Sequence, residues 1–152
     1  MSDDLRELYQ EVILEHNRNP RNFGELATTN HEARGHNPLC GDQVTIYLDI
    51  EKDIIQDIHF DGQGCAISRA SASLMTAALK GKSIQEAEKE FDAFRAMITA
   101  ESELSSEQVE ELGKLAVFSG IRGYPSRVKC AGLPWHTLMA AIHESKEKVS
   151  TE

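Results

Sequence analysis

The feature that most constrains this chain of 152 residues is a strict alternation of side chains over residues 43–50. A period of two indicates a β-strand with one face buried and the other in solvent. The segment "IIQDIHF" follows after the turn "EKD" and predicts a hairpin partner, so the sheet should be antiparallel with one wet face. The apolar positions are Val44, Ile46, Leu48 and Ile50, and Gln43, Thr45, Tyr47 and Asp49 lie between them.

An amphipathic helix is predicted over residues 4–17, because apolar residues recur there at helical spacing. The segment "NRNPRNFG" ends this helix, and His16 would place a cation where it suits the helix dipole. One irregular strand is expected near "NHEAR". After the hairpin, Gly62 and Gly64 form a turn, and a helix runs from it to Gly81. The predicted buried face of that helix comprises Ile67, Ala70, Ser71, Leu74, Ala77 and Ala78.

Three more helices are predicted in the second half of the chain. Ser83 and Glu86 form the capping-box pattern that opens the first of them. Pro134 fits the first position of the last helix, where its missing N–H costs nothing. We therefore expect a single α+β domain over residues 1–152, with an antiparallel sheet of about three strands packed against several helices. A polar tail from about residue 146 is expected to fray. The middle helix would bury Val109, Leu112, Leu115 and Ala116.

The charge and hydropathy of the chain exclude several classes of partner. A net charge of −9 argues against nucleic acid and against an anionic membrane surface. No apolar run approaches the roughly 20 residues that a membrane-spanning helix needs. The N-terminus "MSDDLRELYQ" is acidic and lacks the apolar stretch of a secretory signal, so we expect a cytoplasmic protein.

The chain has three cysteines, Cys40, Cys65 and Cys130, and each falls at the end of a predicted element or in an irregular stretch. An odd number in a reducing compartment is not a disulfide framework, which leaves buried filler, reactive thiols or a metal site. None of the three belongs to an apolar stripe, so their positions favour a site over filler.

A metal site is the interpretation that unites these cysteines with one nearby carboxylate. Gly41 separates Cys40 from Asp42 and would let both side chains turn toward one point, and Cys65 begins a helix, where N–H groups stabilise a thiolate. Three thiolates and a carboxylate match the four-coordinate preference of Zn²⁺, although His36 could replace Asp42. Such a site stays negatively charged, and nearby cations could offset that charge. The candidates are Arg69, Arg127 and Lys129.

Four motifs, in order, give the chain a resemblance to a known family. "NPRNFG", "PLCGDQV", "GQGCAISRASASLM" and "SRVKCAGLPW" resemble those of the IscU/NifU N-terminal family of iron–sulfur cluster assembly proteins. The finer resemblance is to the SufU branch. Lys129 stands where scaffold-type IscU proteins carry a His before the last Cys, and "LGKLAVFSGIRGYPSRVKC" looks like the insertion of SufU proteins.

The resemblance implies a zinc-dependent sulfurtransferase of the IscU/SufU-like fold, which carries persulfide sulfur from a SufS-like cysteine desulfurase to a downstream iron–sulfur scaffold complex. It implies zinc ligation by Cys40, Asp42, Cys65 and Cys130, with Cys40 as the sulfur acceptor. Arg127 and Lys129 would then lie beside the site or face the partner. The alternatives are a scaffold for a [2Fe–2S] cluster on the same ligands, since thiolates bind both metals, and a purely structural zinc module.

Overall fold

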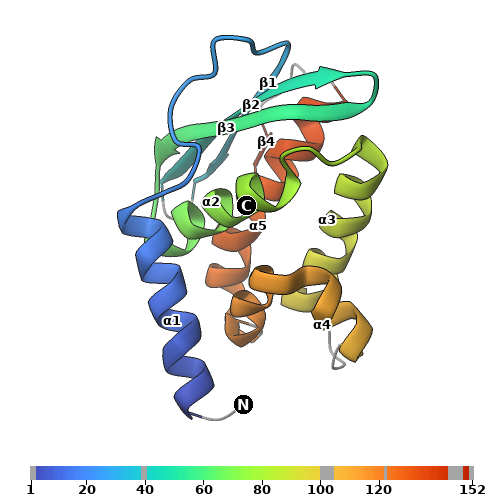
Figure 1. The fold of residues 1–152 in the computed structure, drawn as a ribbon. Helices are drawn as coiled ribbons and strands as arrows, with labels where there is room; N and C mark the ends of the chain where they lie inside the picture. The colour runs from blue at the N-terminus through green and yellow to red at the C-terminus, as the bar shows by residue number, and fades with distance from the viewer. Residues whose placement is uncertain (1–2, 39–40, 100–104, 122, 144–148, 151–152) are drawn as a thin grey trace.

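A four-stranded sheet lies at one side of the molecule, and the helices pack against one of its faces (Figure 1). The computed structural model describes residues 3–38, 41–99, 105–121, 123–143 and 149–150. The elements are α1 (Asp3–Arg18), β1 (His31–Asn37), β2 (Asp42–Glu51), β3 (Ile54–Gln63), α2 (Ala66–Leu79), α3 (Ile84–Thr99), α4 (Ser106–Leu112), the 3₁₀ helix η1 (Gly113–Ile121), α5 (Pro125–Ile142) and β4 (Val149–Ser150).

The strand order is β3-β2-β1-β4, and β2 pairs antiparallel with both β1 and β3. Helix α5 packs against β1 and β2, and α2 packs against β3. Helix α1 lies against α2 on one side of this layer, and α3 lies against α5 on the other side (Figure 1). The α+β fold predicted from the sequence is therefore confirmed. None of the described helices is both long and apolar enough to cross a membrane.

The β2–β3 hairpin carries the predicted alternation. In β2, the four apolar residues of the pattern are buried and Gln43 is exposed; the buried residues are Val44, Ile46, Leu48 and Ile50. Lys52 and Asp53 both have positive φ, +52° and +63°, which is the two-residue turn whose twist matches that of antiparallel strands. Tyr47 departs from the pattern, because it is buried on the outer face, where its hydroxyl donates to Asp61 at 2.8 Å.

Strand β1 is regular over seven residues, where the sequence predicted only an irregular strand near "NHEAR". Its buried positions are Ala33, Gly35 and Asn37, so the strand lacks the large apolar residues that reveal alternation. Gly35 is required because α5 lies so close that a Cβ there would overlap the Thr137 hydroxyl. Val149 and Ser150 form the short strand β4, which pairs in parallel with Gly35 and His36. The other residues of the predicted polar tail from about residue 146 lie outside the described residues, so its fraying stays a prediction.

The last helix begins at Pro125, so the prediction that Pro134 opens it is wrong. Pro134 lies inside α5, where its ring nitrogen has no hydrogen to donate to the carbonyl one turn earlier, that of Cys130. The next carbonyl, that of Ala131, accepts a hydrogen bond of 2.6 Å from the buried Ser71 hydroxyl of α2. This contact supports the backbone beside the proline. Cys130 consequently lies within the helix and not in a broken stretch before it.

The predicted helix over residues 109–116 is also divided in the structure. Helix α4 ends at Leu112, and Gly113 has a φ of +53°, which an α-helix does not accommodate. The chain continues as η1, in which Leu115 to Phe118 are all buried. Four consecutive buried residues cannot share one face of an α-helix.

Helix α2 is enclosed by the sheet, α1 and α5, and it is buried on more sides than predicted. Ala70, Ser71 and Leu74 are buried as expected, whereas Ala77 is exposed. The capping box after α2 is confirmed, because the Glu86 N–H donates to Ser83 Oγ at 3.0 Å and the Ser83 N–H donates to Glu86 Oε1 at 3.2 Å.

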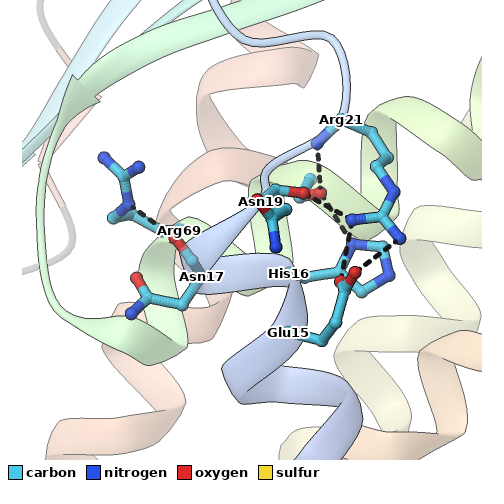
Figure 2. Close-up of polar contacts among 7 residues, drawn as sticks. Glu15, His16, Asn17, Asn19, Arg21 and Arg69 are labelled. Carbon is cyan, nitrogen blue, oxygen red and sulfur yellow. Dashed lines mark hydrogen bonds and ion pairs between the residues drawn. The ribbon is translucent and has the colours of Figure 1, made fainter.

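A polar cluster joins the end of α1 to the middle of α2 (Figure 2). His16 is buried, with its Nδ1 2.7 Å from Ser73 Oγ, and the Arg21 N–H donates to the same oxygen at 2.8 Å. Burial lowers the pKa of His16, and Arg21 lowers it further, so the imidazole is neutral at pH 7. The prediction of a His16 cation at the helix end is therefore wrong.

The segment "NPRNFG" also ties α2 to the edge of β3. The Asn22 side-chain amide donates to Thr76 Oγ1 at 3.1 Å, and the Asn22 carbonyl accepts from the Phe60 N–H at 3.0 Å. Arg69 of α2 donates from Nε to the Asn17 carbonyl at 3.4 Å (Figure 2). These bonds fix α2, and with it the position of Cys65, which caps its N-terminus.

Candidate metal centre

Three elements that are distant in sequence bring Asp42, Cys65 and Cys130 together. Asp42 is the first residue of β2, Cys65 caps the N-terminus of α2, and Cys130 lies in the second turn of α5. Their ligand atoms, one carboxylate oxygen and two sulfurs, all lie within 4.8 Å of one another. Within the described part of the chain, this is the one group of three such side chains that could hold a metal ion.

The Asp42 carboxylate is buried and is held against the start of α2. The Cys65 N–H donates to Oδ1 at 2.9 Å, and the Cys65 thiol lies 3.6 Å from Oδ2. Gly64 permits this approach, because a Cβ there would lie only 3.1 Å from Oδ1 and 3.2 Å from the Ser68 hydroxyl oxygen. The unpaired N–H groups at the helix start favour a negative charge at this position.

Cys65 is the exposed member of the group, whereas Asp42 and Cys130 are buried. As the N-cap of α2, its sulfur accepts a hydrogen bond of 3.5 Å from the Ser68 N–H. The expectation that Cys65 begins a helix is confirmed. Solvent or a partner therefore reaches the group from the side of Cys65.

The protonation of the buried Cys130 thiol depends on whether a cation is bound at the group. Burial raises the pKa of Cys130 strongly, and Asp42 and Cys65 raise it further, because they accept a hydrogen bond from the thiol and repel the charge of the thiolate. Without a positive ion, the thiol therefore stays protonated. A divalent cation would reverse this balance, because it attracts each anionic donor directly. Two sulfurs and a carboxylate oxygen are donors that Zn²⁺ accepts, so these residues fit a zinc site.

Cys40, the predicted fourth ligand and sulfur acceptor, lies outside the described residues, and its role stays a prediction. Residues 37, 38, 41 and 42, on either side of it, are described. Asn37 pairs with Asp42 at the end of the β1–β2 ladder, and the Gly41 N–H donates to the Asn37 carbonyl at 2.8 Å. Gly41 has a φ of +76°, a conformation that suits glycine in a tight turn. Cys40 precedes Asp42 by two positions in the sequence.

The predicted cations Arg69, Arg127 and Lys129 lie within four positions of Cys65 or Cys130 in the sequence. Arg127 is exposed, and its guanidinium lies over the Tyr124 ring. Arg69 stacks over Phe23, and Lys129 is half-buried. His36 is on β1, opposite Gln43, and is not part of the ligand group among the residues described.

Gly64 and Ser68 contribute to the geometry, and the sequence analysis did not identify either as a site residue. Gly64 leaves room for the carboxylate, and Ser68 donates its backbone N–H to the Cys65 sulfur. The available signal was the glycine directly before a cysteine at a predicted helix start, where close backbone approach is often needed. Nothing in the sequence pattern singled out Ser68.

Comparison with known proteins shows similarity over almost the whole chain. Residues 8–149 match the NifU-like N-terminal domain family. A protein named zinc-dependent sulfurtransferase SufU from Bacillus subtilis strain 168 is 38% identical over 139 residues, 91% of this chain and 92% of that one. An iron–sulfur cluster assembly scaffold protein IscU from Streptococcus pyogenes serotype M1 is 36% identical over 93% of this chain and 86% of its own.

Solved structures show the same fold. FiSufU from Fervidobacterium islandicum AW-1 superposes with a TM-score of 0.81 at 34% identity, over 90% of this chain and 98% of that one. A NifU-like N-terminal protein from Brucella abortus gives a TM-score of 0.80 at 25% identity, over 92% and 95% of the two chains. The similarity therefore extends over the elements that carry Asp42, Cys65 and Cys130.

Proposed function

Because the chain belongs to the NifU-like N-terminal domain family of iron–sulfur cluster assembly, we propose that it is a zinc-dependent sulfurtransferase. It would accept persulfide sulfur from a SufS-like cysteine desulfurase and deliver it to a downstream iron–sulfur scaffold complex. The observation that carries this proposal is the convergence of Asp42, Cys65 and Cys130 in a chain 38% identical to the SufU sulfurtransferase. The bacterial relatives fit a cytoplasmic location.

The residues that would hold zinc are Cys40, Asp42, Cys65 and Cys130. When bound, the ion would keep the cysteines as thiolates and hold the ends of three elements together. The chain's own contribution is to orient the donors. The Cys65 N–H fixes the Asp42 carboxylate, and the surrounding core keeps Cys130 out of water. Cys65 leaves one side of the group open to a partner.

Cys40 is the proposed sulfur acceptor, because the resemblance of "PLCGDQV" to SufU proteins implies this role and Asp42, two positions later, belongs to the ligand group. The Cys40 thiolate would attack the outer sulfur of the desulfurase persulfide. A new S–S bond forms on Cys40 while the S–S bond of the donor breaks, and the donor cysteine leaves as a thiolate. The exchange needs no external oxidant or reductant.

Replacement of Cys40 by Ser tests this assignment. The Cys40→Ser variant should gain no persulfide from the desulfurase while keeping part of its zinc on the remaining ligands. Intact-protein mass spectrometry after incubation with desulfurase and cysteine measures the added sulfur, and metal analysis measures the zinc. Persulfide formation at the wild-type rate in this variant would show that another cysteine is the acceptor.

A cluster scaffold is the second candidate function, because several relatives are named iron–sulfur cluster assembly scaffold protein IscU. Protein purified without oxygen separates the two. Colourless protein with one zinc per chain supports sulfur transfer, and brown protein with iron and acid-labile sulfide supports scaffolding. If zinc is present but the protein leaves desulfurase turnover unchanged, the site is a structural zinc module.

A further inference from the structure

The edge of the sheet beside β1 is covered by a strand of only two residues. Val149 and Ser150 of β4 pair in parallel with Gly35 and His36, and β4 is the outermost strand of the sheet. On its other side, β1 is joined to β2 by seven residue pairs. Because each pair adds few main-chain hydrogen bonds, β4 can leave β1 while the pairing of β1, β2 and β3 stays intact.

The chain returns along β1 after α5 ends. His31 Nδ1, at the start of β1, lies 3.0 Å from the Ala141 carbonyl oxygen, which places the end of α5 beside the start of β1. Strand β4 pairs near the other end of β1. Residues 143–148 connect α5 to β4, so β4 stays attached to the molecule when its pairing with β1 opens.

Strand β1 leads directly to the predicted sulfur acceptor. Its last residue, Asn37, precedes Cys40 by three positions. The Gly41 N–H donates to the Asn37 carbonyl at 2.8 Å, so the chain on both sides of Cys40 is anchored at the end of β1. A segment that pairs with β1 is therefore bound close to Cys40 along the chain.

His36 has a polar atom that the present edge leaves without a hydrogen bond. Its side chain is half-buried, and Nδ1 is buried with no hydrogen-bond partner among the residues that the structure describes. A buried polar atom without a partner costs free energy. Because His36 is one of the two residues that pair with β4, a segment that replaces β4 can supply the missing partner.

We propose that β4 is a displaceable strand, and that an extended segment of the downstream iron–sulfur scaffold complex replaces it on β1 when that complex takes sulfur from Cys40. This inference rests on the proposed function. Strand addition at a sheet edge derives its affinity from main-chain hydrogen bonds. The desulfurase and the acceptor both have to reach Cys40, and the open side at Cys65 serves the first of them. The edge of β1 gives the second its own contact.

The exposed side chains of β1 specify the kind of segment that fits. Glu32 and Arg34 are exposed and lie two positions apart, so they share one face of the strand. Opposite charges on neighbouring strands stabilise a pairing. The segment that fits β1 therefore carries a basic and an acidic residue two positions apart.

A double proline variant, Val149→Pro with Ser150→Pro, tests whether β4 competes for the edge. Successive N–H groups of a strand point to opposite sides, so one of the two prolines removes an N–H that faces β1. The matched control is Val149→Thr with Ser150→Thr, which keeps both N–H groups and favours a strand. Hydrogen–deuterium exchange measures the pairing of β1, and biolayer interferometry measures the affinity of each zinc-loaded protein for the purified scaffold complex.

The proline variant should bind the scaffold complex about threefold or more tighter than the wild-type protein, because β4 no longer has to be displaced. The threonine variant should stay within about twofold of wild type. Binding of the complex to the wild-type protein should slow the exchange of the β1 amides. Equal affinity in the proline and threonine variants would overturn the proposal, and so would β1 amides whose exchange the complex leaves unchanged.

Two further outcomes would overturn the choice of partner. Slower exchange of the β1 amides with the desulfurase alone would assign the edge to the sulfur donor. A proline variant that dimerises, as measured by light scattering, would assign the edge to a second copy of this chain, because exposed sheet edges pair with one another.

The proposed function fails separately, if the wild-type protein gains no persulfide from the desulfurase, because binding of the scaffold complex is measured without that reaction. Thermal melting checks the folding of each variant. If the proline variant unfolds, a chain that ends at His143 removes β4 altogether and decides the outcome by the same criteria.

Discussion

At the scale of single residues, Gly64 determines how closely the Asp42 carboxylate can approach the start of α2. A Cβ on residue 64 would lie 3.1 Å from Oδ1 and 3.2 Å from Cγ of Asp42, which is tighter than nine in ten real Cβ contacts. The carboxylate would have to move away from the Cys65 N–H that now holds it at 2.9 Å. The distance between Asp42 and the two sulfurs would change with it.

We expect Gly64→Ala to weaken zinc binding by about tenfold or more, the typical effect of displacing a group that orients a metal ligand. Competition with a chromophoric chelator measures the zinc affinity. The control is Gly120→Ala, because nothing lies within 4 Å of a Cβ at that position. Equal affinity in the two variants would show that the Asp42 position does not depend on Gly64.

Asp42 and Cys65 could be identified as candidate ligands from the sequence because they fall at element ends. Cys65 was expected at a helix start and is the N-cap of α2. Gly64 was interpreted only as part of a flexible turn, because the contact that constrains it comes from Asp42, a residue of another strand. His16 was misinterpreted for a similar reason. Its partner Ser73 lies 57 positions away, and no local pattern reveals that contact.

At the scale of elements, α2 and α5 carry the two described cysteines and are joined by a buried hydrogen bond. The Ser71 hydroxyl of α2 donates to the Ala131 carbonyl of α5 at 2.6 Å. Ala131 follows Cys130 directly, so this bond fixes the backbone next to a predicted ligand. The relative position of the two sulfurs depends on this packing.

Ser71→Ala should lower the free energy of unfolding by about 1–3 kcal/mol, because it leaves a buried carbonyl with a weaker hydrogen-bonding environment. It should also weaken zinc binding, because α5 can shift against α2. Urea unfolding and chelator competition measure the two effects. Ser126→Ala, an exposed site on α5, is the control and should change neither quantity. Wild-type stability in Ser71→Ala would show that the bond contributes little.

The contact between α1 and α2 should weaken in acid because of His16. The pKa of His16 is lowered in the folded state, so the unfolded chain binds the proton more readily. The stability of the folded state is therefore fully present above the unfolded pKa of about 6.5 and is lost as the pH falls toward the folded pKa. His136, whose pKa burial also lowers, acts in the same direction.

Replacement of His16 by Gln should reduce the loss of stability between about pH 7.5 and pH 5.5, because one titrating group is removed. Urea unfolding at both pH values measures the free energy of unfolding, and the difference between the two values is the loss of stability. Ser73→Ala, which removes the hydrogen bond but keeps the imidazole, should lower stability and retain the pH dependence. If His16→Gln loses as much stability in acid as the wild-type protein, other groups account for the effect.

Element boundaries could be predicted where a local signal decides them. The alternation of β2 and the Ser83–Glu86 capping box depend on neighbouring residues, and both were predicted correctly. The start of α5 was predicted incorrectly, because Pro134 is a local signal that the surrounding structure overrides. Tyr124 and Pro125 supply the real start, and the Ser71 contact supports the helix next to the proline.

At the scale of the whole molecule, the fold gathers residues from β2, α2 and α5 at one end of the helix–sheet layer. The sequence predicted the α+β fold and the positions of Asp42 and Cys65 at element ends, whereas Cys130 lies inside α5. It could not predict the separations among the ligand atoms, because these depend on how α2 and α5 pack across the sheet. The resemblance of the motifs led us to expect a common site, and the structure shows that the ligand atoms of Asp42, Cys65 and Cys130 lie within 4.8 Å of one another.

The most direct test of the metal centre is zinc K-edge X-ray absorption on the protein as purified. Ligation by Cys40, Asp42, Cys65 and Cys130 should give about three sulfur neighbours near 2.3 Å and about one oxygen near 2.0–2.2 Å, with one zinc per chain. An Asp42→Ala variant should lose that oxygen neighbour or replace it. Protein that contains no zinc, or zinc surrounded only by oxygen and nitrogen, would contradict a site built from these residues.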